Sequence, residues 1–366
     1  MSNLKHNPMH GPNKMKLGVF AANAAGGLAL TTLPERWEGK WEDILQVAQI
    51  ADRAGIEFLL PLARWLGFGG ETNSRLHCFE SLTHSAALAA ATENIAIFST
   101  VHTPFVHPVF AAKSISTIDH VSGGRAGLNI VCGWNEPEYA VFGIEKLNDV
   151  YSLGYEWHEI FSRIVTGEGP FDFAGEYFDL KGVIGQPSTL QQPGPIILSA
   201  AFSPTGRDFA ARTSDYIFTV FDDFESGATH MADIQNRALK VSREIKACTA
   251  CHVVCRDTQS EAEDYYESFA VTNEDKIAVD RHMTLKKENS NSHDPAAYEL
   301  YRKRFAAGAG SFPLVGSPQT IVDDMQKLHE IGFSGIAASF VNYLEELPYF
   351  IEKVLPLMCE AGLREN

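Results

Sequence analysis

Eight short apolar runs, separated by stretches with helical periodicity, are the feature of this chain that most constrains its fold. The runs occupy residues 16–21, 57–62, 95–101, 127–132, 195–201, 216–221, 248–256 and 334–340. Such alternation predicts βαβ units and a parallel sheet, and eight strands are the number that a closed barrel needs. We therefore predict an α/β protein with a (β/α)8 TIM barrel fold.

The stretches between the runs carry helix signals of their own. Residues 41–55 place apolar side chains every three and four positions, and Gly55 marks the end of that pattern. Ser317 followed by Pro318 predicts another helix start, with a capping hydroxyl ahead of a proline at the first helical position.

Two insertions interrupt the alternation, one after the fourth strand and one between the seventh and eighth. Residues 135–195 contain a predicted helix at about 151–166 and a predicted hairpin that turns at Ala174 and Gly175. Residues 275–315 include the most polar part of the chain, and we interpret them as an active-site lid. A plain surface excursion is the alternative interpretation.

Length and charge limit the class of protein. The 366 residues are compatible with one large domain over residues 15–366, and we expect residues 1–14 to be a flexible arm or to pack on a partner subunit. The formal net charge of −16 argues against a nucleic-acid surface. No apolar run is long enough to cross a bilayer, and the polar N-terminus lacks a secretory apolar region. We expect a cytoplasmic protein.

Three of the six cysteines lie in the segment CTACHVVC, which invites a metal interpretation. In a buried strand, however, Cys248 and Cys251 would point to opposite faces, and no second cluster supplies further ligands. We therefore predict small core residues in a reducing compartment and no metal.

The segment Ser116–Tyr139 combines a helix end, a two-glycine turn, a short apolar strand and a polar loop at the strand's C-terminal end. Ligands bind at that end of the strands in α/β barrels. Asn129, Trp134 and Glu138 could then form one wall of a ligand site. An ordinary buried strand between two turns is the alternative.

Four motifs carry a resemblance to a known family. They are LGFGGET (66–72), STIDHVSGGR (116–125), GLNIVCGWNEPEY (127–139) and the block at 187–211 that contains ILSAAFSPTGRDFAA. With them the chain resembles the bacterial-luciferase-like flavin-dependent monooxygenases over nearly its whole length. It is most similar to the pyrimidine oxygenase and dimethylsulfone monooxygenase subgroup.

The resemblance implies a barrel that binds FMN at the C-terminal ends of its strands, as reduced FMN supplied by a separate NAD(P)H:flavin reductase. It implies a homodimer or homotetramer that inserts oxygen from O2 into a small organic substrate through a flavin peroxide. The alternatives are an F420-dependent oxidoreductase of the same barrel family and a sulfone or alkanesulfonate monooxygenase. A flavin-binding barrel without turnover is less favoured.

The resemblance also assigns cofactor contacts: Ala63, Arg64, Asn129, Glu138, Tyr155 and Ser203. Ser203 precedes a predicted helix start, where free N–H groups favour a phosphate dianion, although a plain helix cap would explain it equally well. Tyr155 is assigned to the neighbourhood of the ribityl phosphate, with helix packing as the alternative. A cation at Arg64 would stabilise the negative charge of reduced flavin, with a surface salt bridge as the alternative.

Three residues are candidates for the chemistry. The resemblance places Thr100 and Asn129 beside the pocket where dioxygen reacts, and donors there would hold the developing negative charge. For Thr100, an ordinary β-branched strand residue is the alternative. His102 is a candidate for substrate contact or proton transfer, and a local hydrogen-bonding role is its alternative.

We expect the substrate to enter beside the aromatic side chains Trp65, Phe68, Phe105 and Trp134. This wall lacks the cationic cluster that a sulfonate would want, which favours an N-heteroaromatic ring. One position departs from the subgroup: Gly154 stands where close relatives carry an arginine before the tyrosine that matches Tyr155. The phosphate contact would then be weaker or come from elsewhere, for example from Arg207.

Overall fold

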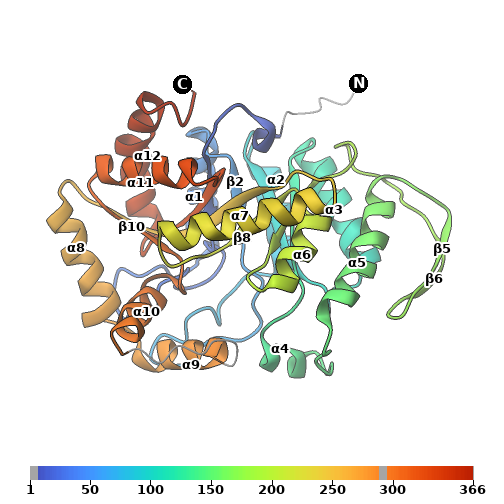
Figure 1. Cartoon of the computed structure of the whole chain (residues 1–366), viewed down its shortest axis with the longest axis horizontal. Helices are drawn as coiled ribbons and strands as arrows, with labels where there is room; N and C mark the ends of the chain where they lie inside the picture. Colours follow the sequence, from blue (N-terminus) through green and yellow to red (C-terminus); the bar gives the residue numbers. More distant parts are fainter. Residues whose placement is uncertain (1–6, 288–294, 366) are drawn as a thin grey trace.

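A closed barrel of parallel strands forms the centre of the molecule (Figure 1). The computed structural model describes residues 7–287 and 295–365. The barrel strands pair in chain order, and the last returns to the first: β1 (Lys16–Phe20), β2 (Phe58–Leu60), β3 (Ala96–His102), β4 (Ala126–Val131), β7 (Ile196–Ala200), β8 (Tyr216–Thr219), β9 (Lys246–Cys255) and β11 (Gly335–Ser339). Each predicted apolar run overlaps one of these strands, so the predicted barrel is confirmed.

Helices surround the barrel and bury its outer face. They are α1 (Trp41–Arg53), α2 (Ser81–Ala91), α3 (Pro108–Ser122), α5 (Val150–Val165), α6 (Pro204–Thr213), α7 (Phe224–Lys240), α8 (Gln259–Glu267), α11 (Pro318–Glu330) and α12 (Tyr343–Glu360). The predicted start of α11 is confirmed, because the Ser317 side chain accepts a hydrogen bond from the Thr320 backbone N–H. No helix within 7–287 or 295–365 is long and apolar enough to cross a membrane.

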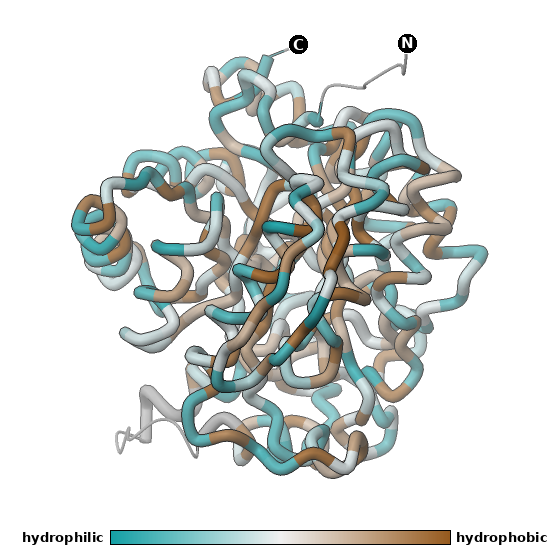
Figure 2. The backbone as a smooth tube through the Cα atoms, turned by 90° about the vertical axis from the view of Figure 1, so that its right-hand side faces the viewer, coloured by the Kyte–Doolittle hydropathy of each residue, from teal (hydrophilic) through white to brown (hydrophobic). Residues whose placement is uncertain are grey.

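The barrel interior away from the mouth is filled by large apolar side chains. Phe58 and Phe98 lie among the inward-facing residues, opposite glycines on neighbouring strands. A Cβ atom on Gly18 would lie 2.2 Å from the Phe58 ring, and one on Gly127 would lie 2.5 Å from the Phe98 ring. Figure 2 shows brown, hydrophobic strand segments in the middle of the molecule. The barrel is therefore a packed core whose ligand space is restricted to its mouth.

The cysteines of CTACHVVC lie in β9 and are buried. Cys248 belongs to the apolar cluster inside the barrel, whereas Cys251 belongs to the cluster outside it, as the alternation of a strand requires. Among the residues that the structure describes, no group of three or more His, Cys, Asp or Glu side chains could hold a metal ion.

The segment before β1 packs against the N-terminal ends of the barrel strands. Its short 3-10 helix, η1 (Pro8–His10), buries Met9 completely among the inward-facing residues. The Tyr216 hydroxyl donates to the Met9 carbonyl at 3.3 Å, and Asn7 Nδ2 donates to Gln191 Oε1 at 2.9 Å. The expectation of a flexible arm over 1–14 is therefore wrong for residues 7–14, while residues 1–6 lie outside the described part of the chain.

The first insertion contains α4 (Glu136–Val141), α5 and the hairpin of β5 (Phe171–Ala174) and β6 (Asp179–Val183). The predicted hairpin is confirmed. The Glu156 carboxylate of α5 accepts hydrogen bonds from the backbone N–H groups of Glu176 and Tyr177 at the hairpin turn. Figure 1 shows α4 at the end of the molecule opposite the two termini.

The second insertion is structured over its described residues. It contains α9 (Lys276–Lys287), α10 (Pro295–Gly308) and a strand that was not predicted, β10 (Phe312–Gly316); a π-helical turn, η2 (Ser268–Thr272), precedes it. Phe312 and Ala338 both pair with Cys251, so β10 and β11 flank β9 on opposite sides. Residues 288–294, which lie within the predicted lid, are outside the described part. The lid function of 275–315 stays a prediction.

Candidate active site

Thr100 and Asn129 lie side by side at the C-terminal ends of β3 and β4. They are register partners, and both are almost completely buried. The Thr100 hydroxyl donates to the Pro61 carbonyl at 2.7 Å and accepts from Asn129 Nδ2 at 3.2 Å. The Thr100 backbone N–H donates to Ser81 Oγ at 2.7 Å, which ties this pair to the start of α2. The structure thus brings the two chemistry candidates into direct contact.

A buried ion pair lies at the same mouth. Glu138 of α4 is fully buried, and its Oε1 accepts from Arg64 Nη1 at 3.3 Å and from the Trp65 backbone N–H at 3.1 Å. The Arg64 guanidinium lies 4.6 Å from the centre of the Trp134 ring, a cation–π contact. Residues from the loop after β2 and the loop after β4 are therefore held together by charge and by ring stacking.

Several buried polar atoms at this mouth have no hydrogen-bond partner among the described residues. They include Arg64 Nε, His102 Nδ1, Asn129 Oδ1 and Glu138 Oε2. An unsatisfied buried polar atom destabilises a fold by about 1–3 kcal/mol, so a cluster of them needs an explanation. A set that includes both donors and acceptors fits a polar ring system such as an isoalloxazine, which has both kinds of group on its edge.

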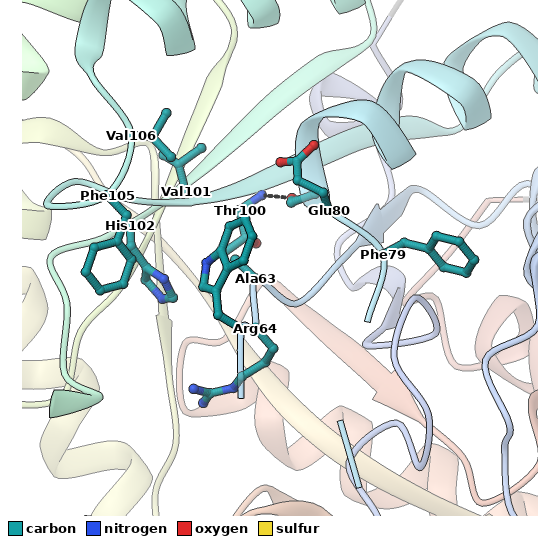
Figure 3. Close-up of a pocket in the computed structure, with 11 residues that line it drawn as sticks. Ala63, Arg64, Phe79, Glu80, Thr100, Val101, His102, Phe105 and Val106 are labelled. Atoms are coloured by element: carbon teal, nitrogen blue, oxygen red, sulfur yellow. Dashed lines mark hydrogen bonds between the residues drawn. The ribbon is translucent and has the colours of Figure 1, made fainter. Parts of the chain in front are cut away.

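His102 is held in its neutral form. Burial, with a smaller contribution from the nearby Arg64 charge, lowers the pKa of His102 to about 3. A neutral imidazole offers one donor and one acceptor at physiological pH. Figure 3 shows His102 and Arg64 with Thr100 and Phe105 around one pocket. Ala63 lines the same pocket, so these predicted residues are brought together.

The predicted phosphate end lies at the start of α6. Ser203 is the N-cap, and its Oγ accepts from the Gly206 backbone N–H at 3.1 Å. The Tyr151 hydroxyl lies 3.4 Å from Ser203 Oγ, whereas Tyr155 packs against Phe209 with ring centres 5.1 Å apart. Tyr151 was missed in the sequence analysis, although its spacing of four residues from Tyr155 puts both on one face of α5.

Packing explains why a glycine stands at position 154. Gly154 is buried where α5 approaches β4 and α6, and a Cβ atom there would lie 2.9 Å from Cys132 Sγ and 3.1 Å from Phe209. An arginine at this position would not fit. Arg207, the suggested substitute, lies with its Nε 2.7 Å from the Asp233 carboxylate, so its charge is already paired.

The aromatic residues predicted to contact substrate fall into two groups. Trp65 and Phe105 both contact Phe142, which the sequence analysis missed, with ring centres 4.9 and 4.5 Å away. Phe68 is only 1% exposed and stacks on His282 of α9 at 4.1 Å. This geometry does not support Phe68 as a substrate contact, because its ring is occupied in joining the β2 loop to α9.

A parallel (β/α)8 barrel with polar side chains at the C-terminal ends of its strands has the architecture of a barrel enzyme. Residues 15–335 match the family of luciferase-like monooxygenases, and the chain belongs to that family. The predicted family, and with it the monooxygenase class, is confirmed.

Two curated relatives come from the predicted subgroup. An FMNH2-dependent dimethylsulfone monooxygenase of Pseudomonas putida is 29% identical, and the match covers 94% of this chain and 96% of that protein. Pyrimidine monooxygenase RutA of Acinetobacter baylyi is also 29% identical, over 94% of this chain and 95% of its own. Among solved structures, riboflavin lyase (RcaE) has the same fold with a TM-score of 0.83, at 23% identity over 96% of this chain and 92% of its own.

Proposed function

We propose that this protein is a two-component monooxygenase that binds reduced FMN and inserts one oxygen atom of O2 into a small organic molecule. The cluster of unsatisfied buried polar atoms at the barrel mouth carries this proposal, because it fits the edge of a flavin ring. The relatives named as reduced-FMN-dependent or pyrimidine monooxygenases support the same reaction class. When bound, reduced FMN supplies the electrons that activate dioxygen.

The residues of the chain would bind, orient and shield the cofactor. Arg64 places a cation beside the ring, where reduced flavin carries negative charge, and Glu138 fixes that cation in position. Ser203 and the N-terminus of α6 offer N–H and O–H groups to a phosphate dianion, with Tyr151 and Tyr155 on the facing helix. Asn129 and His102 present polar atoms from the barrel wall.

The mouth favours a flat substrate over a sulfonate. Trp65, Phe105 and Trp134 provide aromatic surface, whereas the cation Arg64 is assigned to the cofactor. An N-heteroaromatic ring is therefore the substrate class that we favour, with dimethylsulfone-like and alkanesulfonate substrates as the alternatives. We also predict that a separate flavin reductase supplies reduced FMN by diffusion. A homodimeric or homotetrameric state and a cytoplasmic location are further predictions.

The cofactor assignment can be tested by anaerobic titration of the purified protein with reduced FMN, oxidised FMN and F420. We expect micromolar or tighter binding of reduced FMN and weaker binding of the oxidised form. Preference for F420 would move the protein to hydride transfer without oxygen. If none of the three binds, the barrel and its family stand but the proposed cofactor is wrong.

Asn129 gives a direct test of the chemistry. We expect Asn129→Ala to keep the fold and some flavin binding while oxygenation falls by about 10²-fold, the usual effect of losing a group that orients the reacting partners. Turnover of a heteroaromatic substrate with excess reductase measures the change, and circular dichroism checks the fold. Asn236→Ala, at an exposed position on α7, is the matched control. Unchanged turnover in Asn129→Ala would remove this residue from the mechanism.

A further inference from the structure

The direction of each hydrogen bond in the chain Pro61–Thr100–Asn129 is fixed by elementary bonding. A carbonyl oxygen only accepts, so the single hydroxyl hydrogen of Thr100 points to Pro61 O at 2.7 Å. Towards Asn129, Thr100 Oγ1 can therefore only accept. Asn129 must turn its NH2 group to Thr100, as it does at 3.2 Å, and its Oδ1 is left over.

This arrangement resists a flip of the Asn129 amide. A flipped amide would set Oδ1 against a lone pair of Thr100 Oγ1, with no hydrogen between the two oxygens. Thr100 itself is held by the bond from its backbone N–H to Ser81 Oγ and by pairing within β3 and β4. Its β-branched side chain also has few rotamers. The acceptor Oδ1 of Asn129 thus stays buried and without a partner among the described residues.

We propose that Thr100 is a positioning residue that keeps an acceptor, Asn129 Oδ1, facing the bound flavin, so that the site selects the ligand's redox state. This inference rests on the proposed function. Reduced isoalloxazine has an N–H donor at N5, which Oδ1 can accept, whereas oxidised isoalloxazine has a lone pair there, which Oδ1 opposes. The expectation that Thr100 donates to developing charge is replaced, because its hydrogen is already committed to Pro61.

The test compares the dissociation constants of oxidised FMN and anaerobically reduced FMN for three proteins. We expect the native chain to bind reduced FMN at least about tenfold more tightly, and a tenfold ratio corresponds to a shift of about 30 mV in the two-electron potential of bound FMN. Thr100→Val has nearly the same shape but cannot accept from Asn129, so the ratio should fall to about one. Thr100→Ser keeps both hydrogen bonds and should keep the ratio.

The outcomes separate this inference from the proposed function. If the native chain binds neither form of FMN, the proposed function fails. If it binds reduced FMN preferentially and Thr100→Val keeps the full ratio, the proposed function stands and the positioning role is overturned. If Thr100→Val does not fold, Asn129→Leu provides the second measurement. In Asn129→Leu the ratio of the dissociation constants of oxidised and reduced FMN should also fall to about one. A ratio that stays at the native value would overturn the inference.

Discussion

Arg125 and Asp119, the charged residues of the motif STIDHVSGGR, act on the fold and lie away from the barrel mouth. Arg125 is 1% exposed and donates to the carbonyls of Ala89 and Thr92 at the end of α2, at 3.1 and 2.9 Å. Asp119 is fully buried and accepts from the backbone N–H of Leu190 at 2.6 Å. Both residues satisfy backbone groups of connections at the N-terminal ends of the strands. The charged residues of this family motif therefore stabilise the fold and do not contact the ligand site.

Gly154 permits a residue-scale prediction. In a helix interior, Gly→Ala usually stabilises by about 1 kcal/mol. Here we expect Gly154→Ala to lower the free energy of unfolding by about 1–3 kcal/mol, because the new methyl group overpacks the space beside Cys132 Sγ. Urea unfolding measures the change, and Glu159→Ala on the exposed face of α5 is the control. Adding Cys132→Ala should recover part of the loss, whereas simple additivity of the two changes would contradict this explanation.

At the scale of elements, the loop after β2 is tied to the second insertion. Asp275, which precedes α9, accepts from both the backbone N–H and the hydroxyl of Thr72 at 2.8 Å. Its other oxygen accepts from the Ala278 backbone N–H in the first turn of α9 at 3.3 Å. Phe68 and His282 stack between the same two elements. One carboxylate thus caps a helix and fixes the loop that carries Arg64.

We expect Asp275→Ala to loosen this connection. Three hydrogen bonds would be lost, which should lower the local stability of α9 by about 1–3 kcal/mol. Hydrogen exchange of the amides in 276–287 measures that stability. The exchange rate of these amides should rise by about one to two orders of magnitude. Lys276→Ala, an exposed change next to it, should leave exchange as it is. Equal protection of α9 in the Asp275 variant would show that packing alone holds this helix.

Over the whole molecule, several histidines are buried in their neutral form. Burial lowers the pKa of His84 and His158 to about 4 and that of His102 and His252 to about 3. The ordinary value of 6.5 applies to the unfolded chain. Below that pH the unfolded state therefore binds more protons than the folded state, and folding stability falls as the pH drops from 6.5 towards 4. We expect a protein that is stable near neutrality and sensitive to mild acid.

His84 isolates one contribution to this pH dependence. It lies on α2 facing α1, and neither ring nitrogen has a hydrogen-bond partner among the described residues. Between pH 7.5 and 5.5 its protonation in the unfolded state should remove about 1.3 kcal/mol of stability. His84→Gln should therefore show a smaller loss over this range, by about that amount, in urea unfolding at the two pH values. A loss of the same size in both proteins would mean that His84 is protonated in the folded state.

The sequence by itself determined the elements of the barrel, because these depend on neighbours in the chain. Alternating apolar runs specified all eight barrel strands, and Ser317 with Pro318 specified the start of α11. The motifs also specified the family, and they pointed to Arg64, Thr100 and Asn129, which the fold brings to one mouth. Local patterns suffice for such features, since a helix or a strand is encoded by residues within a few positions of one another.

Only the tertiary structure decided the contacts between distant segments. It showed that Asn7 and Met9 are buried at the N-terminal end of the barrel, that β10 joins β9, and that Tyr151 lies beside Ser203. It also gave the Thr100 hydroxyl its direction, because Pro61 and Asn129 are 39 and 29 residues away from Thr100 in the chain. Such contacts depend on how elements pack and on which donors remain free after packing, and no local periodicity encodes either.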